Sequence, residues 1–365
     1  MTRLFVILVF GIVTLPATES WSWRITQSML FLSAAIQCWR GKLRLPRSPL
    51  LFLLPAAAAW AIIQSIAGTT AYRWATMDAG LTWLAWLAAF LLACDEKLPR
   101  AIAYFSASVA AVSVLYRFLG GQMGPFVYEN QYAAFIELTL PLVLVAARGF
   151  SLLAPAIMIV SVFVSGSVGG SILVVVEAVA LLLFRRRAAH VAALAALVAV
   201  LVTVTGWDLL AGKLAREDAL RVRRWLAASS IEMTRDRPWM GWGLGTWAIV
   251  YPAHATFDDG IYDNQAHNDW AQWTAEGGLP FLGLTVLMAV MIARAAMRVP
   301  WAIGLLFVLA HCVIDYHFQE RPAFGALYFA VCGAATFLAA SSAPSPAPVR
   351  SARGSSAPPP SPVSS

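Results

Sequence analysis

Hydrophobic side chains follow one another in long runs that charged residues rarely interrupt. Runs such as LFLLPAAAAWAIIQSIAG (51–68) and AAHVAALAALVAVLVTVTG (188–206) approach the roughly 20 residues with which a helix crosses a bilayer core. Twelve such segments are predicted, near residues 4–18, 25–39, 50–68, 79–94, 101–119, 131–147, 150–165, 169–184, 188–206, 279–297, 300–318 and 323–340. The pattern predicts an all-α fold, a polytopic transmembrane helical bundle of about twelve spans.

One long polar stretch breaks this pattern. Residues 207–278 contain no full span, and they carry ten of the 19 acidic and seven of the 26 basic residues. A single large polar loop in a membrane protein usually carries its chemistry. The chain is therefore predicted to comprise nine transmembrane helices (1–206), a catalytic loop (207–278), three further transmembrane helices (279–340) and a disordered tail (341–365).

The loop divides into a helix, a glycine-rich turn and a second short helix. Good helix formers fill residues 213–236, and RPWMGWGLGTWAIVYP (237–252) supplies the tight turn. Asn268 or Asp269 can cap a helix that Gly277 and Gly278 stop. Taken singly, these features also fit plain structural roles, such as a solvated or lipid-binding arginine face, helix capping, an incidental histidine and an ordinary tight turn.

Charge placement predicts the orientation of the chain. Of its 365 residues only 12% are charged, and the mean hydropathy is +0.70. With a cytoplasmic N-terminus, fifteen Lys and Arg residues fall on the inner side and four on the short outer loops, namely Arg24, Arg73, Arg117 and Arg321. The positive-inside rule then places both termini in the cytoplasm. The net charge of +7 therefore reflects topology, and nucleic-acid binding is not expected. The first run, although it follows Arg3 as in a signal peptide, is expected to stay as an anchor.

The order of the loop features resembles one known family. Arg221 and Trp225, RPWMGWGLGT (237–246), Tyr251-Pro252, His267-Asn268-Asp269 and EGGLP (276–280) follow one another before a span, as in the O-antigen ligase and O-antigen polymerase family. Upstream, GPFVYENQYAAFIELTLPL (124–142) and SGSVGGSI (165–172) resemble the family's outer loop and its Ser-x-Ser-Arg-Gly motif, and HCVIDYHF (311–318) is similar to its penultimate span. The resemblance covers residues 120–320.

The resemblance implies a GT-C-like glycosyltransferase at the outer face of the bacterial inner membrane, with a periplasmic active site. Its donor would be a glycan on undecaprenyl diphosphate, and its acceptor a sugar hydroxyl of lipid A-core. Polysaccharide polymerase and protein O-oligosaccharyltransferase are the open alternatives. Val168 stands where the family has the arginine of its motif. Arg73, Arg117 or Arg321 could substitute for it, the donor could be held differently, or the chain could be an inactive relative.

The transfer chemistry assigns roles to particular side chains. The diphosphate leaving group already carries negative charge, so arginine is needed more than a general acid; Arg221 is the first candidate and Arg224 the second. His267 can accept the proton of the attacking hydroxyl, and Asp269 could orient it. No cofactor or metal is expected, and a single displacement would invert the anomeric centre. The remaining predicted substrate-binding residues are Trp225, Asn268, Asp269, Asn130, Arg237 and Arg321.

A transporter of lipid-linked glycans is the competing class of protein. It should show repeats, interrupted helices and polar residues spread through the bilayer midplane. No repeat is found, and the polar residues gather in one loop. Glu137 and Glu177 are the charges deepest within the predicted spans, and they fit either a functional or a packing role. Asp315 and His317, near the outer end of the eleventh span, are expected to border the same cavity.

Overall fold

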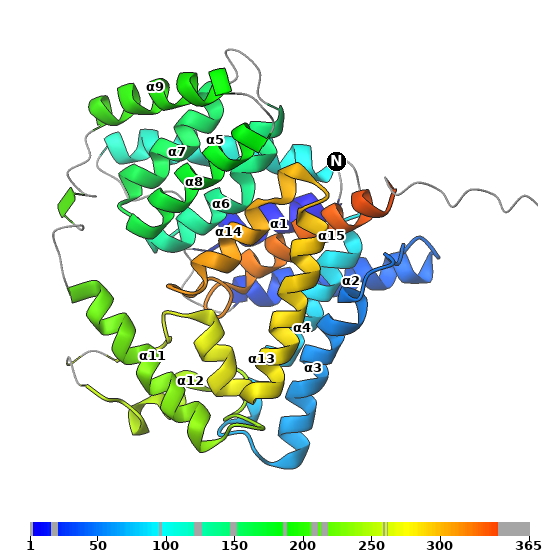
Figure 1. Cartoon of the computed structure of the whole chain (residues 1–365). Coiled ribbons are helices and arrows are strands. Elements are labelled where there is room, and N and C mark those ends of the chain that lie inside the picture. Colours follow the sequence, from blue (N-terminus) through cyan, green and yellow to red (C-terminus); the bar gives the residue numbers. More distant parts are fainter. Residues whose placement is uncertain are drawn as a thin grey trace, which may run out of the picture.

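The computed structural model describes residues 3–15, 21–94, 97–119, 126–146, 152–184, 188–205, 211–212, 218–257, 260 and 262–341. Every regular element within these ranges is a helix, which confirms the predicted all-α class (Figure 1). Each predicted span contains a helix: α1 (Arg3–Val13), α2 (Trp21–Trp39), α3 (Leu50–Ala67), α4 (Arg73–Leu92), α5 (Leu98–Phe118), α6 (Glu129–Ala146), α7 (Leu153–Ser165), α8 (Val168–Phe184), α9 (Ala188–Thr205), α13 (Asp269–Ala296), α14 (Gly304–His311) and α15 (Pro322–Ser341).

The protein is a multi-pass membrane protein. In the described part of the chain, five helices are long and apolar enough to cross a bilayer, namely α3, α4, α5, α13 and α15. Five further apolar segments are shorter, and they include α1, α7 and α8. The total of twelve spans, the assignment of domains and the position of the termini stay predictions.

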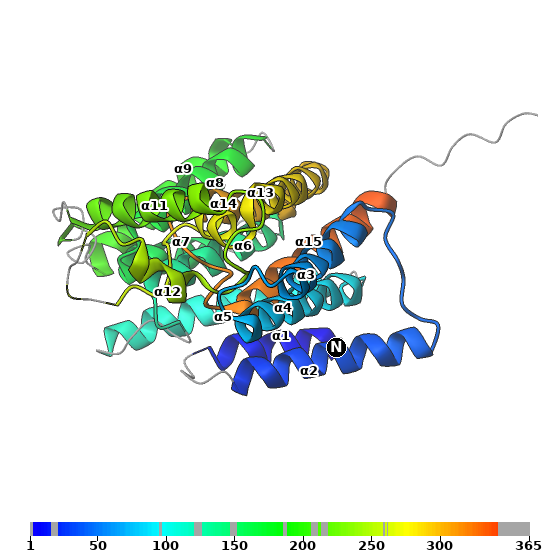
Figure 2. The ribbon, with the colours of Figure 1, turned by 90° about the horizontal axis from the view of Figure 1, so that it is seen from below.

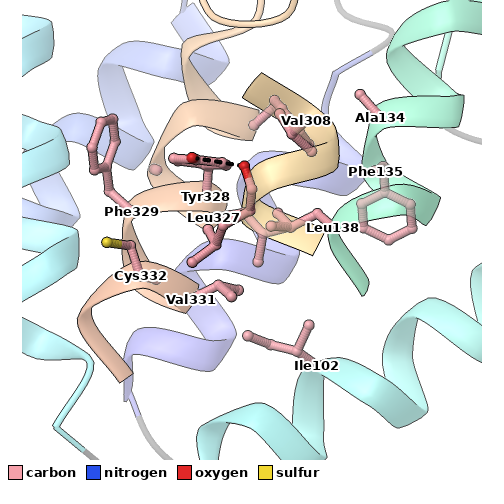
Figure 3. Packing of buried hydrophobic residues seen from close by; sticks show 14 of the residues in the cluster. Ile102, Ala134, Phe135, Leu138, Val308, Leu327, Tyr328, Phe329, Val331 and Cys332 are labelled. Atoms are coloured by element: carbon pink, nitrogen blue, oxygen red, sulfur yellow. Dashed lines mark hydrogen bonds between the residues drawn. The ribbon is translucent and has the colours of Figure 1, made fainter. Parts of the chain in front are cut away.

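Close contact between small and aromatic residues holds the centre of the bundle together. The Tyr328 hydroxyl of α15 donates to the Leu305 carbonyl of α14 at 3.1 Å, and Leu138 and Phe135 of α6 lie beside it (Figure 3). A Cβ on Gly325 would lie 2.5 Å from the Trp86 ring, so glycine is what lets α15 approach α4. Such packing of small residues is how helices associate where lipid removes the hydrophobic driving force.

The polar loop forms a layer across one end of the bundle (Figures 1 and 2). It contains α11 (Asp218–Asp236), α12 (Trp247–Val250) and a 3-10 turn at Tyr251–Ala253. The Gln64 side chain, near the end of α3, donates to the Met240 carbonyl at 2.6 Å and accepts from the Leu244 amide at 3.1 Å. The layer is therefore fastened to the bundle and is not a free domain. Residues 213–217, at the start of the predicted loop helix, lie outside the described residues, as do 258, 259 and 261.

Helix α13 is longer than predicted and kinked. Its backbone leaves the helical region at Gly278, where φ is 75° and ψ is 179°, and then continues to Ala296. The amide of Leu279 donates to the Pro238 carbonyl at 2.7 Å, so the kink also anchors the turn that follows α11. Gly278 does interrupt the helix as expected, but Gly277 does not end it, and the capped helix and the tenth span form one element.

Helix α14 is shorter than predicted. It ends at His311, and residues 312–321 form a loop in place of the end of the expected span 300–318. The Asp269 amide donates to the Cys312 carbonyl at 3.0 Å and to the Asp315 carbonyl at 3.2 Å, so the loop makes its polar contacts with the start of α13. This loop brings Asp315 to the same end of the bundle as the polar layer.

Candidate active site

A buried carboxylate lies where three distant parts of the chain meet. Asp315 accepts from the Arg223 guanidinium of α11 at 3.0 Å and from the Asn130 amide group of α6. Its other oxygen accepts from the Tyr316 amide at 2.9 Å. The Asp315 side chain is wholly buried, whereas Arg223 is 24% exposed. The cluster of Asp315, Asn130 and Arg223 is therefore buried at its carboxylate, and its Arg223 guanidinium reaches the surface.

His267 stands over this carboxylate. Its Nδ1 lies 3.6 Å from Asp315 Oδ1 and has no hydrogen bond within the described residues. The Tyr316 ring meets the imidazole edge to face at 4.6 Å, and Tyr128 stacks on Tyr316 at 5.8 Å. Asn268 caps α13 by accepting from the Ala271 amide at 2.9 Å, so His267 directly precedes a fixed helix start. The imidazole is thus aimed from a rigid support.

The backbone of His267 is strained. It is the one non-glycine residue with a positive φ, 49°, in the part of the chain that the structure covers. Such a conformation is uncommon outside glycine and costs of order 1 kcal/mol or more, so the surrounding structure has to impose it. In this backbone conformation the His267 imidazole faces Asp315 and is still 24% exposed.

A pocket of about 430 Å³ opens at this cluster. It is lined by Arg223, Arg224, His267 and Asn268, together with Ala227 and the exposed side chains Val313 and Ile314. Two guanidinium groups and an imidazole at one mouth favour an anion with several oxygens.

The charges around Asp315 outweigh its burial. Burial alone would raise the pKa of this carboxyl, but the His267 imidazole and the Arg223 guanidinium hold the pKa down at about 2. Asp315 is therefore ionised near neutral pH. Its negative charge orients His267 and neutralises Arg223.

The lowered pKa of Asp315 predicts an acid-dependent loss of stability. Because the folded value of about 2 is below the ordinary 3.8, the ionised carboxylate stabilises the fold at higher pH. This contribution, about 2 kcal/mol, should be complete above pH 4 and lost as the pH falls toward 2. Thermal unfolding of the purified protein across that range should show the loss. Asp315→Asn should flatten this part of the profile, and an equally steep profile in the variant would contradict the prediction.

Asp269 does not face His267, contrary to the suggestion that it orients the imidazole. Its side chain is wholly buried and accepts from the His317 amide at 2.8 Å and the Phe318 amide at 3.3 Å. Adjacent side chains at the start of a helix point in different directions, which leaves Asp315 as the partner of His267. Asp269 fixes the loop that carries Asp315.

The predicted arginines occupy different places. Arg221 is exposed and lies over the Trp225 ring, with 5.0 Å between the guanidinium carbon and the ring centroid. Arg224 lines the pocket, and its role in binding stays a prediction. Arg237 stacks on Trp242 at 3.8 Å and donates to the Thr69 carbonyl at 2.7 Å, so it secures the turn after α11. Arg223 was not selected from the sequence, yet it is the arginine that contacts Asp315.

The start of α8, where Val168 replaces the expected arginine, joins the same network. Ser167 donates to the Asn130 side-chain oxygen at 2.6 Å, and Asn130 in turn donates to Asp315. Because Asn130 is only 7% exposed, its side chain serves to link Ser167 to Asp315. Arg321 approaches this network through Gln131, the residue after Asn130, whose side-chain oxygen accepts from the Arg321 Nε at 3.1 Å. Arg223 is therefore the cation that reaches the network to which Ser167 belongs.

Further polar side chains continue beneath the cluster. His311 Nδ1 lies 2.8 Å from a Glu137 oxygen, and both residues are buried. The His317 ring packs against His311 at 4.5 Å, and burial lowers the pKa of His317 well below its ordinary range. The Glu177 carboxylate is buried without a hydrogen-bond partner in the described part of the chain. Of the two deep carboxylates, Glu137 thus has a buried ionic partner, whereas Glu177 has none there.

Glu276 holds the glycine-rich turn in place. Its carboxylate accepts from the Gly245 amide at 2.9 Å and the Trp247 amide at 3.0 Å, and its carbonyl accepts from the Gly243 amide at 2.9 Å. A Cβ on Gly241 would lie 2.2 Å from that carbonyl, and its φ is 63°, so the turn needs glycine there. The turn is a structural clamp between α11 and α13.

Glu276→Ala is expected to loosen this layer. Two buried amides would lose their acceptor, at a cost of about 2–5 kcal/mol. Thermal unfolding and limited proteolysis of the purified protein should reveal a lower midpoint and faster cleavage within residues 237–268. Glu232→Ala is the control, because the Glu232 side chain is 49% exposed and forms a surface ion pair with Arg235. Equal protease resistance in both variants would contradict the clamp.

Comparison with known protein families finds a match over part of the bundle and the polar layer. The model of a family described as O-antigen ligase matches residues 153–286, from α7 through the polar layer into α13. The matched region includes Arg223 and His267, whereas Asn130 and Asp315 lie outside it. None of the curated proteins matches the chain.

Proposed function

We propose that the protein is a membrane glycosyltransferase of the ligase type, because residues 153–286 match the model of a family described as O-antigen ligase. It would move a glycan from undecaprenyl diphosphate to a sugar hydroxyl on lipid A-core or on a growing polysaccharide. The observation that carries the proposal is that His267 and Arg223 line one pocket and both face the buried Asp315 carboxylate. These are a base, a phosphate-binding cation and the carboxylate that positions both.

In the proposed reaction, the acceptor hydroxyl attacks the anomeric carbon of the glycan. The bond from that carbon to the acceptor oxygen forms while its bond to the diphosphate oxygen breaks. His267 takes the hydroxyl proton, and the electron pair leaves with the lipid diphosphate. Asp315, at 3.6 Å from Nδ1, favours the tautomer with a proton on Nδ1 and leaves Nε2 as the acceptor. A single displacement of this kind inverts the anomeric centre and requires no metal.

Arg223 and Arg224 would bind the diphosphate as charge develops on it. Arg223 is already held by Asp315 at 3.0 Å, so its guanidinium is oriented before the donor arrives. In this proposal Arg223 takes the role of the arginine that is absent at Val168. Arg224 takes the second position, and Arg221 lies further out, over Trp225.

We further propose that the polar layer faces the periplasm and that both termini are cytoplasmic. The loops that approach the layer are those predicted to be outside: the Ala71 amide donates to the Trp242 carbonyl at 2.7 Å, and Asn130 and Asp315 meet in the site. The fifteen-to-four distribution of basic residues supports the same orientation. A polymerase or a protein O-oligosaccharyltransferase would use the same cluster with another acceptor.

Arg223→Ala is expected to lower kcat/KM for the lipid-linked donor by about 100-fold, the size of effect seen when a group that stabilises developing charge is removed. The assay measures glycan transfer by purified protein. Arg24→Ala is the matched control, since Arg24 also pairs with an aspartate on another helix, Asp78, away from the pocket. A loss of equal size in both variants would indicate general destabilisation and contradict the assignment.

A surface-polysaccharide gel of the host tests the proposed reaction. The deletion strain is compared with wild type and with complementation by the intact gene. Loss of attached polymer, with long lipid-linked glycan accumulating, identifies a ligase; single capped repeats identify a polymerase. An unchanged glycan profile in a strain without a second family member would contradict both.

A further inference from the structure

A second pocket of about 430 Å³ adjoins the first between α11 and the first half of α13. Asn268 lines both pockets, so they meet at the start of α13. On α11 the lining continues at helical spacing, from Arg223 and Ala227 in the first pocket to Ile231 and Thr234 in the second. The two pockets therefore form one groove along α11, which we call the α11–α13 groove.

Arg235 at the second pocket pairs with Glu232, and the threonine hydroxyls and the indole of this pocket point at carbonyl oxygens of the protein. The Thr234 hydroxyl donates to the Ser230 carbonyl at 2.8 Å, and the Thr274 hydroxyl donates to the Trp270 carbonyl at 2.6 Å. The Trp270 indole donates to the Leu309 carbonyl at 3.1 Å. A sugar needs donors and acceptors that point at its hydroxyls, and these hydrogens are already used. The pocket therefore presents a mostly apolar wall.

The groove ends where α13 becomes apolar. Leu279 and Leu282 line the second pocket directly after the Gly278 kink, and the run from Leu279 to Ala296 contains one charged residue, Arg294. Ile231 on the opposite wall is 50% exposed, and Leu279 is 46% exposed. The α11–α13 groove thus changes along its length from a basic mouth at Arg223 and His267 to an apolar end beside a membrane-spanning helix.

We propose that the α11–α13 groove holds the first isoprene units of the donor lipid, between its diphosphate and the bilayer. A prenyl diphosphate has the same order of chemistry, an anion followed directly by a branched hydrocarbon chain. Exposed Ile231 and Leu279 would be removed from water by that chain. The identity of the lipid rests on the proposed function, whereas the groove itself follows from the structure. It predicts that the lipid leaves the site beside α13 and not through the helix bundle.

Photocrosslinking tests the groove without requiring glycan transfer. A benzophenone amino acid replaces Ile231 or, as the matched control, Ile249, which is 51% exposed on α12 of the same layer. The probe is undecaprenyl diphosphate without a glycan, in detergent micelles with the full chain. With a radiolabelled probe we expect a labelled adduct at 231 only, which excess unlabelled undecaprenyl diphosphate removes and a soluble nucleotide-sugar does not. Equal adducts at both positions, or none at 231, would overturn the proposal.

Kinetics provide a second test on the same residues. Ile231→Glu should raise KM about tenfold for an undecaprenyl-linked donor and much less for a donor that carries a methyl group in place of the prenyl chain, because only a prenyl chain enters the groove. Ile249→Glu should change neither. An equal rise for both donors would overturn the proposal. If the benzophenone variant at 231 forms the adduct but wild type transfers no glycan, the proposed reaction fails while the lipid groove stands.

Discussion

Asp315→Asn is expected to reduce glycan transfer by about 10²- to 10⁴-fold, the range for losing the orienting carboxylate of a catalytic histidine. Asparagine has the same shape, and its single side-chain oxygen can still accept from the Tyr316 amide within the loop, although it loses the second oxygen that accepts from Asn130 and Arg223. It lacks the charge that faces His267 Nδ1 at 3.6 Å and Arg223 at 3.0 Å. Initial rates of transfer with purified protein, at saturating donor, would measure the loss.

Asp236→Asn is the matched control for this substitution. Asp236 also faces a histidine, with 2.8 Å between its carboxylate and His254 Nε2, but it is 60% exposed at the end of α11. We expect a rate close to wild type. Thermal unfolding midpoints near neutral pH should show that both variants are folded. A folded Asp315→Asn variant with the wild-type rate would remove Asp315 from the reaction.

The helical architecture could be predicted because the length of an apolar run in the sequence indicates where a membrane-spanning helix begins and ends. The two errors arise where tertiary contacts override that signal. α14 ends at His311 although apolar and aromatic residues continue, because the Asp269 and Asp315 segments bond to each other there. α13 passes through Gly278, since the Leu279 amide finds the Pro238 carbonyl and the helix restarts. Neither contact is visible in local composition.

The candidate site was only partly predictable, for a geometric reason. His267, Asn268, Asn130 and Arg224 were singled out in advance, and the structure brings them to one pocket or its network. The sequence VRR at 222–224 does not reveal which arginine faces inward, because neighbouring helical residues differ by about 100° and the phase of α11 depends on its packing.

The partner of His267 was harder still to identify. Asp315 lies 48 residues after His267 in the chain, within a segment expected to be a span, although it was expected to border the cavity. The nearer carboxylate, Asp269, seemed the simpler partner and is instead buried against the 312–318 loop. A polar residue pair near the end of an apolar run, such as Asp315 and His317, is the signal that points to such a site.

The most direct test of the account is the transfer rate of His267→Ala measured against His254→Ala. Both histidines lie in the polar layer beside an aspartate, but only His267 lines the pocket with Arg223. With purified, folded protein, an undecaprenyl-linked donor and an acceptor sugar, single-turnover rates report proton removal without product release. Losing a general base should slow His267→Ala by about 10²- to 10⁴-fold and leave His254→Ala near wild type. A wild-type rate for His267→Ala would contradict the assignment of this cluster as the reaction centre.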